Sequence, residues 1–164
     1  MPKEGMNRDE YLNKKFGGRA QALKVYKNIE DEGKIANIHF QFKKIKITPN
    51  SFLSHKLLAF AFSKKQQNAV LESIFFHYFI EGKNIGNLEI IVEIAKQTNL
   101  YEEGIEKYLL SEQDNENLLN EAKQASDIGI SGVPCFIFNN EFVVNGAQPK
   151  ENFIKIINSL KINE

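Results

Sequence analysis

Residues 129–149, GISGVPCFIFNNEFVVNGAQP, decide the fold class of this chain. Pro134 precedes an apolar run, residues 135–138, and a proline is tolerated at the start of a strand because its missing N–H faces no ladder partner there. The next two residues, Asn139 and Asn140, can both adopt the positive φ angles of a two-residue type I′ turn. A second apolar run then returns as the partner strand. The stretch therefore predicts a β-hairpin.

A helix is expected after the hairpin, and Pro149 suits its first position. Phe153, Ile156, Ile157 and Leu160 recur at the i, i+3, i+4, i+7 spacing of one buried helix face. The C-terminus therefore predicts a ββα unit.

The preceding 128 residues predict a bundle of helices without repeats or low-complexity linkers. Asn7 followed three residues later by Glu10 is a capping-box pattern, and Gly33 is expected to end the second helix. That helix is expected to face inward through Leu23, Tyr26 and Ile29. The expected helices span residues 7–16, 19–32, 51–62, 65–80, 87–99, 101–110 and 115–128, with residues 35–47 as an extended connection.

Composition excludes several classes of function. The 164 residues carry 21 Lys plus Arg and 21 Asp plus Glu, so no overall field attracts nucleic acid or anionic lipid. No apolar run reaches the roughly 18 residues needed to span a bilayer, and the N-terminus lacks the apolar core of a secretory signal. A single cysteine permits no intrachain disulfide and fits a reducing compartment, so a cytoplasmic location is expected.

Four blocks of sequence resemble one family. The block that carries GVP at residues 132–134 and GAQP at residues 146–149 resembles the DsbA-like thioredoxin family, and more narrowly its FrnE-type oxidoreductases and 2-hydroxychromene-2-carboxylate isomerase-like proteins. Residues 1–8, 49–58 and 78–85 resemble three further blocks of this family, in the same order.

The resemblance implies a mostly α, partial thioredoxin-like fold with a small β-hairpin. Residues 1–128 would form a helical insertion bundle, and residues 129–164 the C-terminal ββα half of the thioredoxin-like domain. The Cys-x-x-Cys helix and the leading β–α–β unit of the family have no counterpart in these residues. The chain is therefore expected to be truncated and inactive alone.

The resemblance also implies substrate-binding residues: Val133, Pro134, Cys135 and His55. Val133 would offer its backbone N–H and C=O to an extended substrate, and Pro134, expected to be cis, would shape the groove. No catalytic residue, cofactor or metal site is identified.

Two of these assignments have alternatives. Cys135 is either a reactive thiol or a small half-buried hydrophobe, and the second interpretation is favoured because a strand lacks the helix dipole that lowers a thiol pKa. His55 either contacts substrate or is hydrogen-bonded within the helical region. His77 shares a helix face with Val70 and Ile74 and is interpreted as a satisfied core histidine.

Three functions remain open at this stage. The first is a DsbA-family oxidoreductase-like protein acting on a protein or small-molecule thiol or disulfide. The second is a glutathione-dependent isomerase-like protein, and the third a non-catalytic helical binding module. Without the family's first strand, the hairpin would expose an apolar edge, which predicts a homodimer through that edge.

Overall fold

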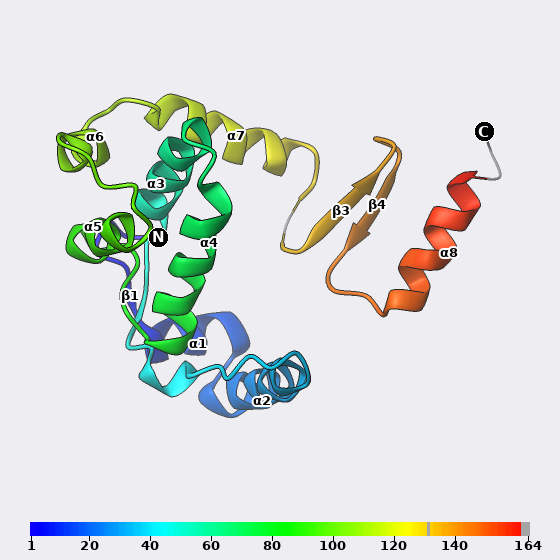
Figure 1. The fold of residues 1–164 in the computed structure, drawn as a ribbon. Helices are drawn as coiled ribbons and strands as arrows, with labels where there is room; N and C mark the ends of the chain where they lie inside the picture. The colour runs from blue at the N-terminus through cyan, green and yellow to red at the C-terminus, as the bar shows by residue number, and fades with distance from the viewer. Residues whose placement is uncertain (131, 162–164) are drawn as a thin grey trace. The chain divides into compact units, whose positions relative to one another are not determined.

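The structure, a computed structural model, describes residues 1–130 and 132–161. The chain divides into two compact units, Met1–Leu118 and Leu119–Glu164. The first unit is helical with one short strand pair, and the second contains most of a helix that begins in the first unit, followed by a hairpin and a C-terminal helix (Figure 1). The mostly helical architecture with two small antiparallel hairpins confirms the predicted fold class. The predicted boundary after residue 128 stays a prediction.

The elements run in chain order as β1 (Met6–Asn7), α1 (Arg8–Phe16), α2 (Arg19–Ile35), the 3₁₀ turn η1 (Phe42–Lys44), β2 (Ile47–Thr48), α3 (Phe52–Ser63), α4 (Gln67–Phe75), the π-helical turn η2 (Phe76–Ile80), α5 (Leu88–Gln97), α6 (Ile105–Leu110), α7 (Asn115–Asp127), β3 (Cys135–Phe138), β4 (Phe142–Asn145) and α8 (Lys150–Lys161). Residues between α2 and β2 are mostly a connection, as predicted, but β2 adds a two-residue antiparallel pairing with β1. The predicted helix over residues 65–80 is α4 continued by η2.

Asn7 caps α1, but only half of the predicted capping box forms. Its side-chain oxygen accepts hydrogen bonds from the backbone N–H groups of Asp9 and Glu10 at 3.0 and 3.2 Å. The Glu10 carboxylate instead binds Lys14, one helical turn further on, at 2.7 Å.

The prediction for α2 was wrong in two respects. Gly33 does not end the helix, which continues to Ile35. The ring of Phe40 packs against Gly33 instead, and a Cβ at this position would lie 2.6 Å from a Phe40 ring carbon. Leu23 and Ile29 do not face inward, since they are 55% and 40% exposed, whereas Ala22 is fully buried. The helix therefore packs through a small residue that periodicity had not selected.

The core of the first unit lies between α3, α4, α5 and α6 (Figure 1). Its best-buried residues include Leu57, Val70, Ile91, Ile94 and Ile105, each 1% exposed or less. These positions follow the helical periodicity of their segments.

A buried lysine, which the sequence did not reveal, fastens the end of this core. Lys56 on α3 is 1% exposed, and its ammonium group donates to the Ser111 carbonyl at 2.6 Å and to the Asn115 side-chain oxygen at 3.0 Å. Burial lowers the pKa of Lys56, and the charge of Asp114 opposes that effect. Lys56 thereby ties α3 to the end of α6 and to the start of α7.

The second unit contains the predicted hairpin. Asn139 and Asn140 have φ angles of 50° and 58°, and the Glu141 N–H donates to the Phe138 carbonyl at 3.0 Å, as the predicted turn requires. Glu141 is an extra residue in the loop, because Phe138 pairs with Phe142.

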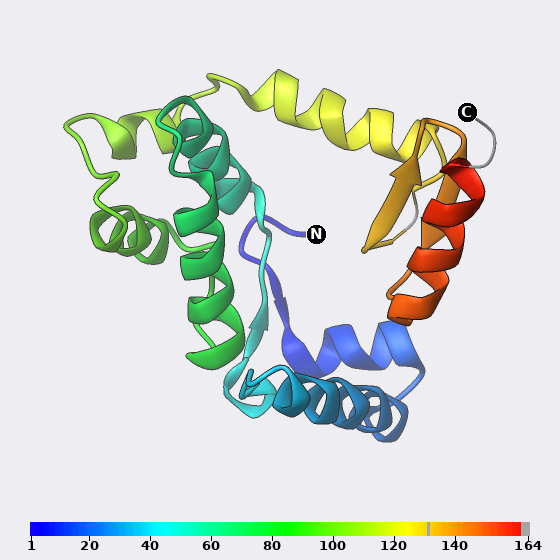
Figure 2. The same ribbon diagram turned by 45° about the vertical axis from the view of Figure 1, so that its right-hand side comes forward.

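The helix α8 begins at Lys150, one residue after Pro149. It lies beside the hairpin (Figure 2), and Phe153 packs on the ring of Phe136 with centroids 4.8 Å apart. The predicted buried face is only half-buried, and Ile157 is 42% exposed, because the small hairpin covers one end of the helix face.

Candidate functional site

The candidate site begins where the chain enters β3. The Val133–Pro134 peptide bond is cis, and the Val133 side chain is 91% exposed. The Gly146 N–H, just after β4, donates to the Pro134 carbonyl at 2.8 Å. The backbone of Pro134 is therefore hydrogen-bonded to the end of β4, while the Val133 side chain faces solvent.

That hydrogen bond also sets the phase of the β3–β4 ladder. In an antiparallel pair, residues that exchange hydrogen bonds alternate with residues that do not. With Pro134 opposite Gly146, the backbone groups of Phe136 and Phe138 point toward β4. Those of Cys135 and Ile137 point away from it, along the other edge of β3. Among the described residues, β3 pairs with β4 alone, so this second edge is open.

One face of the hairpin is also uncovered within its unit. The rings of Phe136 and Phe138 turn toward Phe153 of α8. The opposite face carries the cross-strand pair Ile137 and Val143, whose side chains are 43% and 55% exposed. Between residues 119 and 160, none of the side chains that the structure describes is buried.

Cys135 is the first residue of β3, and its free thiol is half-buried. The thiol lies on a strand, as the sequence predicted. His55 lies on the first turn of α3 in the other unit, and its side chain is exposed. Its backbone N–H donates to the Ser51 carbonyl at 3.0 Å. The assignment of His55 and Cys135 to one substrate site stays a prediction.

A second group of polar residues, the His77 cluster, consists of His77, Glu81, Lys83 and Glu93. His77 is buried on η2, as predicted, but it is not fully satisfied. Its Nδ1 lies 2.7 Å from the Ser73 carbonyl, which can only accept, so Nδ1 carries the proton and donates. Its Nε2 has no hydrogen-bond partner, and the nearest carboxylate oxygens lie 3.7 Å away on Glu81 and 3.9 Å away on Glu93.

Lys83 binds both of these carboxylates. Its ammonium group lies 2.9 Å from Glu93 and 3.1 Å from Glu81. The hydrogen bond from Lys83 lowers the pKa of Glu93, and the hydrogen bonds to Glu93 and Glu81 raise the pKa of Lys83. The helical spacing of His77 and Glu81 was visible in the sequence, whereas the contribution of Glu93 from α5 depends on tertiary packing.

The described parts of the chain contain no group of three or more His, Cys, Asp or Glu side chains placed to hold a metal ion. Nor does any helix in residues 1–130 and 132–161 combine the length and the apolar character needed to cross a bilayer.

The chain is similar to known proteins in both sequence and fold. Residues 2–158 match the model of the DSBA-like thioredoxin domain. The crystal structure of a probable DsbA oxidoreductase from Streptomyces coelicolor superposes with a TM-score of 0.80 at 22% sequence identity, over 94% of this chain and 67% of that chain. At that identity the likeness shows the fold alone. No curated protein matches the sequence.

The His77 cluster predicts a specific pH dependence of stability. Replacing Lys83 by Met removes the ammonium group that holds both carboxylates. The difference in the free energy of unfolding between the wild type and Lys83→Met should be largest between about pH 5 and pH 10. These limits lie near the ordinary pKa values of Glu and Lys side chains. The difference should shrink as the pH falls through the lowered pKa of Glu93, and as the pH rises through the raised pKa of Lys83.

Urea unfolding of both proteins across this pH range measures the effect. Lys64→Met is the matched control, because Lys64 forms an exposed pair with Glu102 at 3.1 Å and should show little advantage at any pH. An advantage of the wild type over Lys83→Met that stays constant with pH would rule out the proposed charge pairing.

Proposed function

The chain belongs to the DSBA-like thioredoxin domain family, and from this we propose that it is a thiol–disulfide oxidoreductase-like module whose β3 edge holds an extended thiol or disulfide substrate. The observation that carries the proposal is the open edge beside Pro134, along which Cys135 and Ile137 present their backbone groups. An extended peptide can add to such an edge as a further strand, with main-chain hydrogen bonds supplying affinity. Val133 and Pro134 would then lie at the end of the substrate strand.

The redox chemistry needs a thiol from outside these 164 residues. In thiol–disulfide exchange, a thiolate attacks one sulfur of a disulfide, forms a mixed disulfide and displaces the other sulfur as a thiolate. A second thiol must then resolve that intermediate. Residues 1–164 contain one cysteine, Cys135. In this proposal they therefore bind substrate but do not complete the redox cycle. The sequence blocks at residues 49–58 and 132–149 support placement in the FrnE-type branch.

In the absence of substrate, the same edge is also proposed to mediate self-association. A lone hairpin is marginal in water, and an unpaired strand with apolar neighbours is a template for pairing with another chain. A second copy that pairs along β3 would satisfy the outward backbone groups and cover part of the Ile137–Val143 face. The isomerase-like and binding-module hypotheses, and the cytoplasmic location, stay predictions.

An insulin-reduction assay tests the redox part of the proposal. Residues 1–164 should not accelerate the precipitation of insulin by dithiothreitol, because a protein with one thiol cannot cycle between a dithiol and a disulfide. Cys135→Ser should behave like the wild type. Robust catalysis by the wild type that disappears in Cys135→Ser would overturn this assignment.

Two proline variants test the role of the edge. Ile137→Pro removes an N–H that points outward from β3, whereas Val143→Pro removes the corresponding N–H from the opposite edge, on β4. In sedimentation velocity over a concentration series, the wild type and Val143→Pro should self-associate and Ile137→Pro should remain monomeric. A wild-type monomer at every concentration, or identical behaviour of the two variants, would contradict association through β3.

A further inference from the structure

A groove between α1, α2 and η1 plays no part in the function proposed above. Its volume is about 650 Å³, within the range of about 300–1,000 Å³ that is usual for small-molecule sites. Tyr26 and Phe42 line its middle, with ring centroids 4.6 Å apart, and Ile45 is buried beneath. Leu23, which was expected in the core, lines it as an exposed apolar wall.

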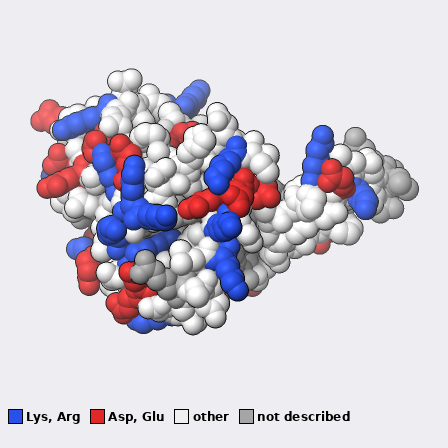
Figure 3. Space-filling model, turned by 90° about the horizontal axis from the view of Figure 1, so that it is seen from below, with Lys and Arg blue, Asp and Glu red and all other residues white. Residues whose placement is uncertain are grey.

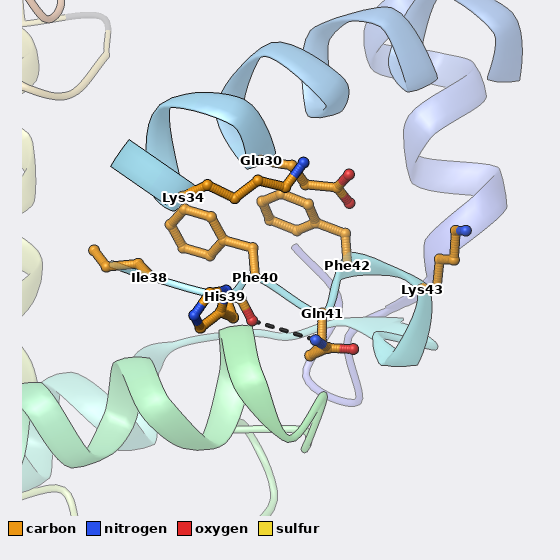
Figure 4. Close-up of a pocket in the computed structure, with 8 residues that line it drawn as sticks. All are labelled: Glu30, Lys34, Ile38, His39, Phe40, Gln41, Phe42 and Lys43. Atoms are coloured by element: carbon orange, nitrogen blue, oxygen red, sulfur yellow. Dashed lines mark hydrogen bonds between the residues drawn. The ribbon is translucent and has the colours of Figure 1, made fainter. Parts of the chain in front are cut away.

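The groove continues past Phe42 into a smaller hollow of about 240 Å³ (Figure 4). There the rings of Phe40 and Phe42 are stacked, with centroids 5.1 Å apart and planes 15° apart. Figure 4 shows the Lys34 side chain running alongside these rings. Apolar surface and a cationic group are therefore adjacent in both parts.

One wall of the groove is held in place by Arg8 at the start of α1. Its guanidinium group donates to the Thr48 hydroxyl at 3.0 Å, to the Tyr78 hydroxyl at 3.2 Å and to the Tyr26 hydroxyl. These bonds connect α1, α2, β2 and η2. The groove is thus preformed, and Arg8 positions its wall.

The lining is richer in positive charge than the rest of the chain. Besides Arg8, its cationic residues are Lys27, Lys34, Lys43 and Lys46, and its acidic residues are Asp9, Glu30 and Asp31. Lys34 and Asp31 pair at 2.8 Å, which leaves four cations against two carboxylates. The whole chain, by contrast, has equal numbers of each. Seen from below, basic and acidic side chains are interspersed over the surface (Figure 3), so the excess of cations is a property of the groove lining alone.

We propose that this groove binds an amphipathic organic anion, with an aliphatic or aromatic body and one carboxylate. The body would lie against Tyr26, Phe42 and Leu23, where burial of apolar surface is favourable. The carboxylate would lie among Lys27, Lys43 and Lys46, none of which forms a salt bridge with another described residue. Charge complementarity selects an anion over a neutral molecule of the same shape.

Isothermal titration calorimetry with octanoate tests the proposal, with octan-1-ol as the uncharged probe. Octanoate should bind saturably, and octan-1-ol should bind much more weakly. Lys27→Glu should weaken octanoate binding by roughly three- to tenfold. Lys24→Glu is the matched control on the same helix, outside the lining, and should leave the affinity unchanged.

A second pair of variants tests the apolar wall. Leu23→Ser should weaken octanoate binding, whereas Val25→Ser, exposed on the same helix but outside the lining, should not. All four substituted positions are exposed, so circular dichroism should show an unchanged fold. Absence of saturable binding, equal binding of octan-1-ol, or equal loss in a variant and its control would overturn the proposal. Preference for an acidic peptide over octanoate would overturn the stated ligand class.

Discussion

A two-stranded sheet leaves one edge of each strand without a partner, and β3 pairs with β4 alone among the described residues. Cys135 and Ile137 therefore carry backbone donors and acceptors that the second unit cannot satisfy by itself. The α8 helix covers the hairpin face that carries Phe136 and Phe138, through Phe153, but no described residue from 119 to 160 is buried. A further strand paired along β3 would satisfy these backbone groups, and the binding role proposed for this unit follows from that.

The first unit, by contrast, has a buried core of its own. Its core is closed by residues such as Leu57 and Ile94, and Lys56 fastens α3 to the segment that leads into α7. Arg8 joins four elements of the same unit through aromatic and hydroxyl side chains. Within this unit, the groove beside α2 is the surface to which a ligand is assigned above.

Local chemistry made much of this architecture predictable. The hairpin, its Asn139–Asn140 turn and the Asn7 cap each depend on residues close together in sequence. The failures involve contacts between distant segments. Gly33 was predicted to end α2, and its contact with the ring of Phe40 could not be read from the sequence. Leu23 follows the apolar period of α2, but that helix packs through Ala22 instead. Lys56, a charged residue, gave no local sign that backbone and amide oxygens would enclose it. The candidate β3 site was predicted from the family resemblance and stays a prediction. Which edge of β3 is open could be read only from the pattern of backbone hydrogen bonds between β3 and β4.

Amide hydrogen exchange on β3 tests the central claim most directly, because it reports each backbone N–H separately. In dilute solution, the amides of Phe136 and Phe138 should be protected by β4, while those of Cys135 and Ile137 should exchange much faster. The slow and fast positions should alternate along the strand. Equal protection of all four amides in a dilute monomer would show that the edge is already occupied, and would contradict the account.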